Sequence, residues 1–229
     1  MRTTTLLLCS TALVLADGPG RIPSQRARAD FALTADPDSP NWKGVKGLWS
    51  ENSPTGDPTP KNRFETRSRW TEKNLYFLFV CPYDELTLKP NPTVTAETNK
   101  LWEWDVAEIF VGADFKNIRQ YLEYQVSPQG EWVDLEIDLD KPKPEGGWTW
   151  NSGFTVKARI DKAKKIWYGE MKIPLSSIDA RPAKAGNEMR INLYRLAGAN
   201  PSRTSTSWQP TGQRSHHVPE SFGRLVLAE

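Results

Sequence analysis

The chain has 229 residues with 30 basic and 28 acidic side chains, which gives a formal net charge of +2 at pH 7. Such a balance argues against a nucleic-acid-binding protein, which would carry a basic patch or stripe. A chain of this length can bury a full hydrophobic core in one domain without help from disulfides. After residue 16 no apolar run is long enough to cross a bilayer, so no membrane-spanning segment is expected.

The first 16 residues have the pattern of a signal peptide. Arg2 supplies a positive charge, a short apolar stretch follows, and small residues precede a candidate cleavage point. Residues 17–29 contain repeated Gly, Pro and Arg, and they are expected to form a flexible leader. The folded domain is therefore expected over 30–229, in a secreted or periplasmic protein. Cys81 is the one cysteine left after cleavage, so it cannot form an internal disulfide.

Most of the remaining chain has the pattern of short strands separated by turns. Turn residues at 71–74 and 128–130 predict a hairpin at each, and residues 175–178 are expected to make one helical turn. Strands are expected at 66–70, 75–81, 105–111, 121–127, 131–138, 154–160, 166–173, 189–196 and 222–227. This pattern predicts an all-β fold, an antiparallel, jelly-roll-like β-sandwich with short helical turns in its loops.

An acidic row follows the strand expected at 131–138. Its members are Asp134, Glu136, Asp138 and Asp140. At a spacing of two they share one face of a strand, and their oxygen atoms would suit calcium. A solvated strand face is the more ordinary interpretation, and no calcium-loop motif accompanies the row. Structural calcium therefore stays an open expectation.

The segment 100–111 combines aromatic and acidic side chains just before an apolar run. A flat indole can cover the apolar face of a sugar ring, while a carboxylate accepts hydrogen bonds from hydroxyl groups. Strict alternation would put Trp102, Trp104 and Glu108 on one face and Ala107 and Ile109 on the other. The second face is the better core face. The first set is therefore expected at a surface or cleft, with a buried tryptophan as the alternative.

The polar stretch 207–222 contains both histidines of the chain, His216 and His217. His216 is a candidate ligand-binding residue, whereas Trp208 and Phe222 are expected to pin the loop to the core. In a strand the two histidines would point to opposite faces. The chain has no phosphate-binding loop, nucleophile elbow or zinc signature, which favours binding over catalysis.

Three segments together resemble the family-9 carbohydrate-binding modules, and in particular their stand-alone secreted relatives. They are residues 102–111, residues 75–77, and the ending Phe222-Gly223-Arg224-Leu225. The resemblance covers roughly residue 30 to the end. It implies a β-sandwich that binds sugars in polysaccharide breakdown, often with structural calcium.

The resemblance also implies site residues. Trp102 falls at the first of two positions that clamp a sugar ring, and Glu108 falls at the position of a sugar-bonding carboxylate. His216 stands at the second clamp position in place of a tryptophan, and Gln125 stands where an arginine is expected. Gln213 and Tyr194 fall near further polar contact positions. A clamp of Trp and His is weaker and more polar than one of two tryptophans.

The leading hypothesis is a secreted, non-catalytic carbohydrate-binding domain whose ligand is an oligo- or polysaccharide and whose candidate partner is a separate glycoside hydrolase. No catalytic residue is assigned. Three alternatives stay open. They are an O-glycosyl hydrolase or a component of one, a haem-binding sandwich with Met171, Met189 and His216 as candidate ligands, and an adhesion domain with a buried Trp102.

Overall fold

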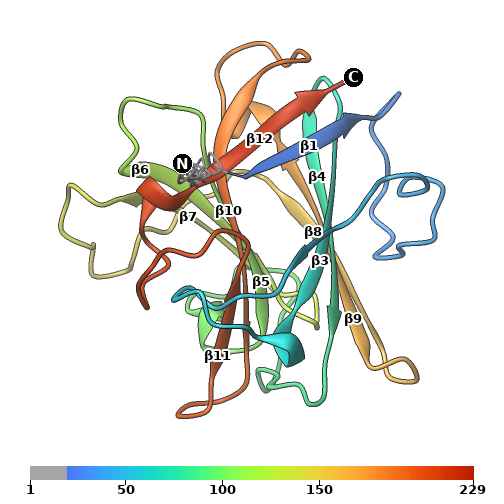
Figure 1. The fold of residues 1–229 in the computed structure, drawn as a ribbon, viewed down its shortest axis with the longest axis vertical. Helices are drawn as coiled ribbons and strands as arrows, with labels where there is room; N and C mark the ends of the chain where they lie inside the picture. The colour runs from blue at the N-terminus through green and yellow to red at the C-terminus, as the bar shows by residue number, and fades with distance from the viewer. Residues whose placement is uncertain (1–19) are drawn as a thin grey trace, which may run out of the picture.

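Twelve strands and four short 3-10 helices make up the regular structure of residues 20–229, the part of the chain that the computed structural model describes (Figure 1). The strands are β1 (Arg21–Arg26), β2 (Leu48–Ser50), β3 (Phe64–Trp70), β4 (Asn74–Pro82), β5 (Val106–Gly112), β6 (Gln120–Val126), β7 (Trp132–Asp138), β8 (Thr155–Asp161), β9 (Ile166–Pro174), β10 (Glu188–Ala197), β11 (Thr204–Ser207) and β12 (Gly223–Ala228). The 3-10 helices are η1 (Pro60–Asn62), η2 (Leu101–Glu103), η3 (Leu175–Ser177) and η4 (Pro219–Ser221). The predicted signal peptide lies outside the described residues.

The strands form one continuous sheet that folds back on itself into two packed halves. Its order is β7-β6-β5-β10-β12-β1-β3-β4-β9-β8, with β11 beside β10 and β2 beside β3. β12 and β1 lie side by side and join the halves (Figure 1). The predicted all-β sandwich is confirmed. Its strands pair antiparallel except at β1, which runs parallel to both β12 and β3.

The main core fills the space between the two halves. Successive residues of a strand point to opposite faces, so alternate apolar side chains are directed inward. Ala107 and Ile109 of β5 meet Phe77 and Phe79 of β4 in one buried cluster. Cys81 also lies in this cluster as a free, buried thiol. Within residues 20–229 no helix is long and apolar enough to span a membrane.

All nine predicted strands occur, with ends within two residues of those expected, and residues 175–177 form the short helix η3. The flexible leader expected over 17–29 is wrong for residues 21–26, which form β1. Ile22 and Ser24 of this strand are buried, and the Ser24 hydroxyl accepts a hydrogen bond of 2.8 Å from the Ser68 hydroxyl. β1 was not predicted because its residues are mostly polar and its partner strands are distant in sequence.

A second buried cluster covers the outer face of β5, β6, β7 and β10, opposite the main core. Its members are Leu101, Val106, Phe110, Tyr121, Val133, Leu135, Ile137, Tyr194, Leu196 and Phe222. Trp102 and Trp148 pack against this cluster from the loops that precede β5 and follow β7. The face is thus partly apolar and partly covered by loops, and a pocket opens within it.

Candidate functional site

A pocket of about 150 Å³ opens on the second cluster. Its walls come from η2, from strands β5, β6, β7 and β10, and from the two loops 139–154 and 208–218. Aromatic rings and carboxyl groups line it together. This combination suits a hydroxyl-rich ligand, since aromatic rings supply apolar contact area and a few fixed polar groups supply hydrogen bonds.

Trp102 is held at this pocket by the short helix η2, which ends before β5 begins. The guanidinium of Arg203, from the β10–β11 loop, donates hydrogen bonds to the backbone carbonyls of Trp102, Glu103 and Trp104. Residues 102–105 do not follow the strand alternation expected from the sequence, because residues 101–103 form η2 and β5 starts only at Val106. Trp104 shares the turn with Trp102, yet it does not line the pocket.

Two buried carboxyl groups, Glu108 of β5 and Glu123 of β6, line the pocket from the sheet. Tyr194, Glu108 and Gln125 lie in one cross-strand row through β10, β5 and β6. Glu123 lies two residues before Gln125 on the same face, and its Oε1 accepts a hydrogen bond of 2.5 Å from Gln125 Nε2. Gln125 therefore orients a carboxyl group of the pocket and does not line the pocket itself.

The two carboxyl groups bind protons more tightly than ordinary glutamates. Burial, and next the negative charge of Glu123, raises the pKa of Glu108 well above its usual value. Burial also raises the pKa of Glu123 to about 7, against the opposing effects of the Gln125 hydrogen bond and the charge of Lys143. Two like charges in a desolvated site disfavour double ionisation. The pocket therefore offers hydrogen-bond donors as well as acceptors near neutral pH.

His216 and His217 both line the pocket, because the loop 208–218 places the two rings there together. A hydrogen bond of 2.7 Å joins His216 Nε2 to Ser205 Oγ, and His216 Nδ1 lies 3.9 Å from Glu108 Oε2. A hydrogen bond of 2.6 Å joins His217 Nδ1 to the Tyr121 hydroxyl. Burial lowers the pKa of His216 to about 4, so this ring is neutral at pH 7.

A lysine lies between two tryptophans at the mouth of the pocket. The Lys143 ammonium is 5.4 Å from the ring centroid of Trp102 and 5.5 Å from that of Trp148. Both distances are within the range of cation–π attraction. Lys143 and Trp148 come from the same loop, 139–154, and both line the pocket. A ring-shaped ligand that reached both indoles would have to displace the lysine side chain.

The predicted ligand residues are distributed unevenly around the pocket. Three of the six line it, namely Trp102, Glu108 and His216. Tyr194 is fully buried and stacks on His216, while Gln125 contacts Glu123. Gln213 lies outside the pocket and is exposed. The structure thus brings together residues from three distant segments and leaves Gln213 apart from them.

Eight of the eleven lining residues were not predicted from the sequence as ligand contacts, and Glu123, Lys143, Trp148 and His217 are among them. Glu123 had a detectable signal, because its spacing of two from Gln125 puts both side chains on one strand face. Lys143 and Trp148 had none, since they lie in a loop without periodicity.

The acidic row of β7 does not converge on one cation. Asp134 is fully buried and accepts a hydrogen bond from the Ser152 amide, Asp138 pairs with Lys141, and Asp140 pairs with Arg119. Among residues 20–229 no group of three or more His, Cys, Asp or Glu side chains is placed to hold a metal ion. The row therefore does not fit the structural calcium that the resemblance implies.

The three haem-ligand candidates do not surround one cavity. Met171 and Met189 are buried in the main core between the two halves of the sheet. His216 lines the pocket on the opposite face. The structure thus gives the haem hypothesis no common site.

Comparison with known proteins identifies the same family along most of the chain. The family model described as "Carbohydrate family 9 binding domain-like" matches residues 38–229. A curated relative from Arthroderma benhamiae, named "Extracellular protein", is 20% identical over 139 residues, which make up 56% of this chain and 62% of the relative. The chain thus spans less than two thirds of that relative's length.

Solved structures share the fold at low sequence identity. A putative carbohydrate-binding protein from Bacteroides uniformis aligns with a TM-score of 0.71 and 14% identity, covering 92% of this chain and 100% of that one. A family 9 carbohydrate binding module from Caldicellulosiruptor kristjanssonii aligns at 16% identity in two complexes. With cellotriose the TM-score is 0.65, covering 91% of this chain and 94% of that one. With glucose it is 0.63, covering 91% and 95%.

Proposed function

The chain belongs to the carbohydrate family 9 binding domain-like family, and from this premise we propose that it is a secreted, non-catalytic domain that holds a saccharide in the pocket beside Trp102. Membership of the family supports a carbohydrate-binding role. The finer proposal rests on one observation in particular. Trp102, Glu108 and His216 are far apart in sequence, yet all three line one pocket that combines aromatic rings with carboxyl groups.

The proposed binding mode assigns each side chain a separate task. Trp102 offers an indole face to the apolar face of a pyranose ring. Glu108 and Glu123 exchange hydrogen bonds with sugar hydroxyl groups, as donors or acceptors according to their protonation. His216 closes the other side as a flat, neutral ring. Tyr194 and Gln125 do not contact the sugar in this mode. Tyr194 stacks on His216, and Gln125 orients Glu123 through a hydrogen bond.

The chemistry of the pocket favours a neutral sugar. A ligand carboxylate would add a third carboxyl group to a desolvated site in which Glu108 and Glu123 already disfavour a second negative charge. A volume of about 150 Å³ is small beside the roughly 300–1,000 Å³ of drug-sized ligand sites, so the proposed occupant is a single ring. The complexes of the Caldicellulosiruptor module with glucose and cellotriose make these two sugars the first to test.

Isothermal titration calorimetry with a panel of neutral mono- and oligosaccharides tests the proposal. We expect saturable binding that Trp102→Ala weakens by at least about tenfold, a loss of ~1.4 kcal/mol. Trp49→Ala is the matched control, because Trp49 is exposed and lies on β2 away from the pocket. Absence of binding to every sugar of the panel, from folded protein, would refute the proposal.

Secretion is proposed on two grounds, the signal-peptide pattern of residues 1–16 and the name "Extracellular protein" of the curated relative. Sequencing the N-terminus of protein recovered from the medium of a secreting host tests it, and Asp17 is the expected first residue. Retention of Met1 in that protein would contradict it.

A separate glycoside hydrolase as partner is proposed on the family resemblance alone, and co-purification with such an enzyme tests it.

One observation supports hydrolysis as a second candidate function. Glu108 and Glu123 both line the pocket, and the pKa of each is raised. Glycoside hydrolases use a carboxylic acid with a raised pKa as general acid. Release of reducing sugar by the wild-type protein, abolished by Glu108→Gln, would favour this function. Tight binding of an oligosaccharide that stays intact would favour the binding domain.

A further inference from the structure

Two neighbouring cavities lie at the end of β1, away from the sugar pocket. Their volumes are about 200 and 480 Å³, and residues 26–30 line both of them. The smaller cavity is completed by residues 71–73, and the larger one by Phe31, Pro40, Asn41 and Arg69. The two together are called the basic cleft below. β1 ends at the right of Figure 1, on the opposite side from β6 and β7, and no cleft residue lines the sugar pocket.

Arginine side chains dominate the larger cavity of the basic cleft. Arg26, Arg28 and Arg69 line it against the single carboxylate of Asp30. Arg28 is exposed and makes no hydrogen bond or ion pair with any residue of 20–229. Arg26 pairs with Glu72 at 3.1 Å, and both side chains of this pair are largely exposed. Because an exposed ion pair contributes little, Arg26 can exchange it for a ligand anion.

The carboxylates of the basic cleft are too few to neutralise its cations. Asp30 Oδ1 accepts hydrogen bonds of 2.5 and 2.9 Å from Thr71 and Asn74. The bond from Thr71 above all lowers the pKa of Asp30, so this carboxylate is ionised and already bonded to the β3–β4 hairpin. Lys73 adds a fourth cation at the smaller cavity. The lining thus holds four cationic side chains and two carboxylates, those of Asp30 and Glu72.

Arg69 is held at the cavity wall by backbone carbonyls. Its Nη1 donates a hydrogen bond to the carbonyl of Arg26 and its Nη2 donates one to that of Lys43, each at 3.3 Å. Burial lowers the pKa of Arg69, and no carboxylate of the described chain pairs with it, although a guanidinium stays charged at physiological pH. Each Nη group carries a second N–H. A partly buried charge without a counter-ion is costly, so an anion that accepted these donors would stabilise it.

The basic cleft also has apolar surface beside its charges. Phe31 lines the larger cavity, and its ring stacks on the buried Tyr76 with centroids 3.8 Å apart and planes inclined by 20°. Ala27, Ala29 and Pro40 line the same cavity. Apolar surface next to guanidinium groups suits a sugar ring that carries an acid, because the ring packs on the apolar surface while its carboxylate pairs with arginine.

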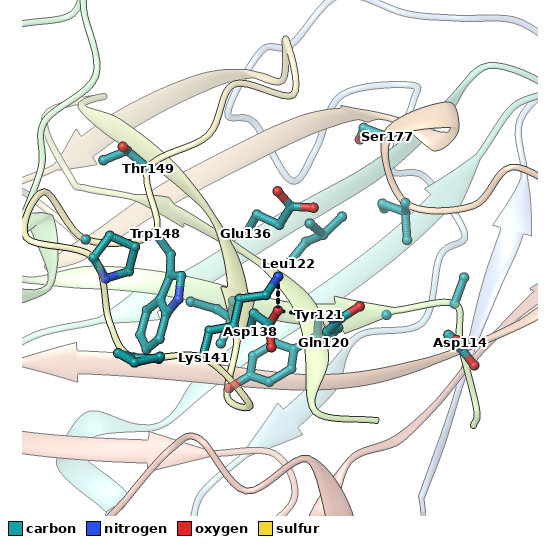
Figure 2. A pocket seen from close by; sticks show the side chains of 17 residues that line it. Asp114, Gln120, Tyr121, Leu122, Glu136, Asp138, Lys141, Trp148, Thr149 and Ser177 are labelled. Carbon is teal, nitrogen blue, oxygen red and sulfur yellow. Dashed lines mark hydrogen bonds and ion pairs between the residues drawn. The ribbon is translucent and has the colours of Figure 1, made fainter. Parts of the chain in front are cut away.

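A cavity of about 600 Å³ beside β7 shows the opposite charge balance (Figure 2). Its one cation, Lys141, already has a partner, since Nζ lies 2.8 Å from Asp138 Oδ2, and Gln120 donates a hydrogen bond of 3.1 Å to the same oxygen. Three carboxylates line it, those of Asp114, Glu136 and Asp138. An excess of cations without partners is therefore a property of the basic cleft and not of cavities in this protein generally.

We propose that the basic cleft binds an acidic polysaccharide, whose carboxylate groups pair with Arg26, Arg28 and Arg69. A guanidinium holds a carboxylate through two parallel hydrogen bonds, which makes this pairing geometrically selective. Two adjacent cavities that share one lining segment suit the repeated charges of a polymer better than one small anion. The whole chain carries a net charge of only +2, so the attraction is local to the cleft. The inference does not depend on the sugar pocket.

Calorimetry with polygalacturonate tests the inference, with its methyl ester as the ligand control because the ester has the same chain without the charge. At an ionic strength of about 0.15 M only close charges attract. We expect polygalacturonate to bind the wild-type protein at least about tenfold more tightly than the ester. Arg28→Ala should weaken this binding by at least about fivefold. Arg21→Ala, which removes the same charge from the exposed start of β1 outside the cleft, should stay within about twofold of wild type.

The remaining outcomes would overturn the proposal. They are absence of polygalacturonate binding by folded wild-type protein, equal binding of the ester, and equal effects of Arg28→Ala and Arg21→Ala. Inorganic phosphate that displaced the polymer at an equal concentration of charge would assign the cleft to small anions instead, and equally tight binding of a DNA oligonucleotide would assign it to polyanions in general. Glucose titrated into the same variants reports on the sugar pocket separately, and circular dichroism verifies that each variant is folded.

Discussion

The imidazole of His216 lies nearly parallel to the phenol ring of Tyr194, with ring centroids 4.6 Å apart and planes inclined by 21°. The Tyr194 hydroxyl donates a hydrogen bond of 2.9 Å to the His216 carbonyl. The imidazole of His216 also shares a hydrogen bond with the Ser205 hydroxyl. Because burial lowers the pKa of His216 to about 4, the ring stays neutral over the physiological range. His216 is thus a rigid, uncharged wall of the pocket.

This geometry predicts that the shape of the His216 ring matters more than its nitrogen atoms. His216→Phe keeps a flat ring on Tyr194 and loses only the bond to Ser205, so saccharide affinity should fall by less than about threefold. His216→Ala removes the wall and should lower affinity by about tenfold. Calorimetry with one sugar compares the two variants. Equal losses would indicate that an imidazole nitrogen bonds the ligand directly.

Arg203 acts as a positioning residue for Trp102. Its planar guanidinium reaches several carbonyls of η2 at once, which a lysine ammonium does not reproduce. Arg203→Ala and Arg203→Lys should both lower saccharide affinity by about tenfold and speed amide hydrogen exchange at residues 101–105, with exchange in β4 unchanged. Arg181→Ala, at an arginine away from the pocket, is the control. Unchanged exchange at 101–105 in Arg203→Ala would show that Arg203 does not hold the turn.

The pocket carboxyl groups predict a pH-dependent stability. Glu123 keeps its proton up to about pH 7 in the folded state but loses it near pH 4.5 when unfolded. The folded state therefore binds more protons in this window, and the free energy of unfolding falls as pH rises through it. His216 acts in the opposite direction, because its pKa is about 4 folded and 6.5 unfolded, so its contribution rises with pH between those values.

Glu123→Gln isolates the carboxyl contribution, because glutamine keeps an oxygen that accepts the bond from Gln125. The free energy of unfolding of this variant, relative to wild type, should grow from pH 4.5 to 7 by about 1–3 kcal/mol and then level off. Denaturant unfolding at several pH values measures it. The exposed Glu72→Gln should show no such growth. A difference independent of pH would contradict the raised pKa of Glu123.

Lys143 should compete with the ligand for the space between the two indoles. Removing it in Lys143→Ala abolishes two cation–π contacts that a sugar ring would otherwise have to break, each worth about 0.5–1 kcal/mol at an exposed site. Affinity for a neutral sugar should therefore rise by about five- to thirtyfold, the factor that a total of ~1–2 kcal/mol gives. Lys73→Ala, at an exposed turn away from the pocket, is the control. Weaker binding by Lys143→Ala would show that Lys143 contacts the ligand directly.

The features predicted correctly from the sequence are those with local causes. The hairpin at 71–74 joins β3 to β4, as its turn residues indicate, and the alternation of Ala107, Ile109 and Val111 identifies the core face of β5. β1 was missed because its pairing is parallel and its residues are mostly polar, so its strand character depends on β12 and β3.

The site was predictable in part for the same reason. Trp102 and Glu108 stand close together in one segment with a recognisable composition. The packing of Trp148 against this site depends on the bridge between Thr149 and Leu135 at the edge of β7. Arg203 fixes the turn at 102–104 through hydrogen bonds to three backbone carbonyls. Every residue type has a backbone carbonyl, so the sequence does not indicate these contacts.

A crystal structure of the protein with bound glucose tests the central claim most directly. The account predicts one pyranose ring in the pocket, with a face against Trp102 and a hydroxyl group within hydrogen-bond distance of the Glu108 carboxyl group. Glucose bound elsewhere, with this pocket empty, would contradict it.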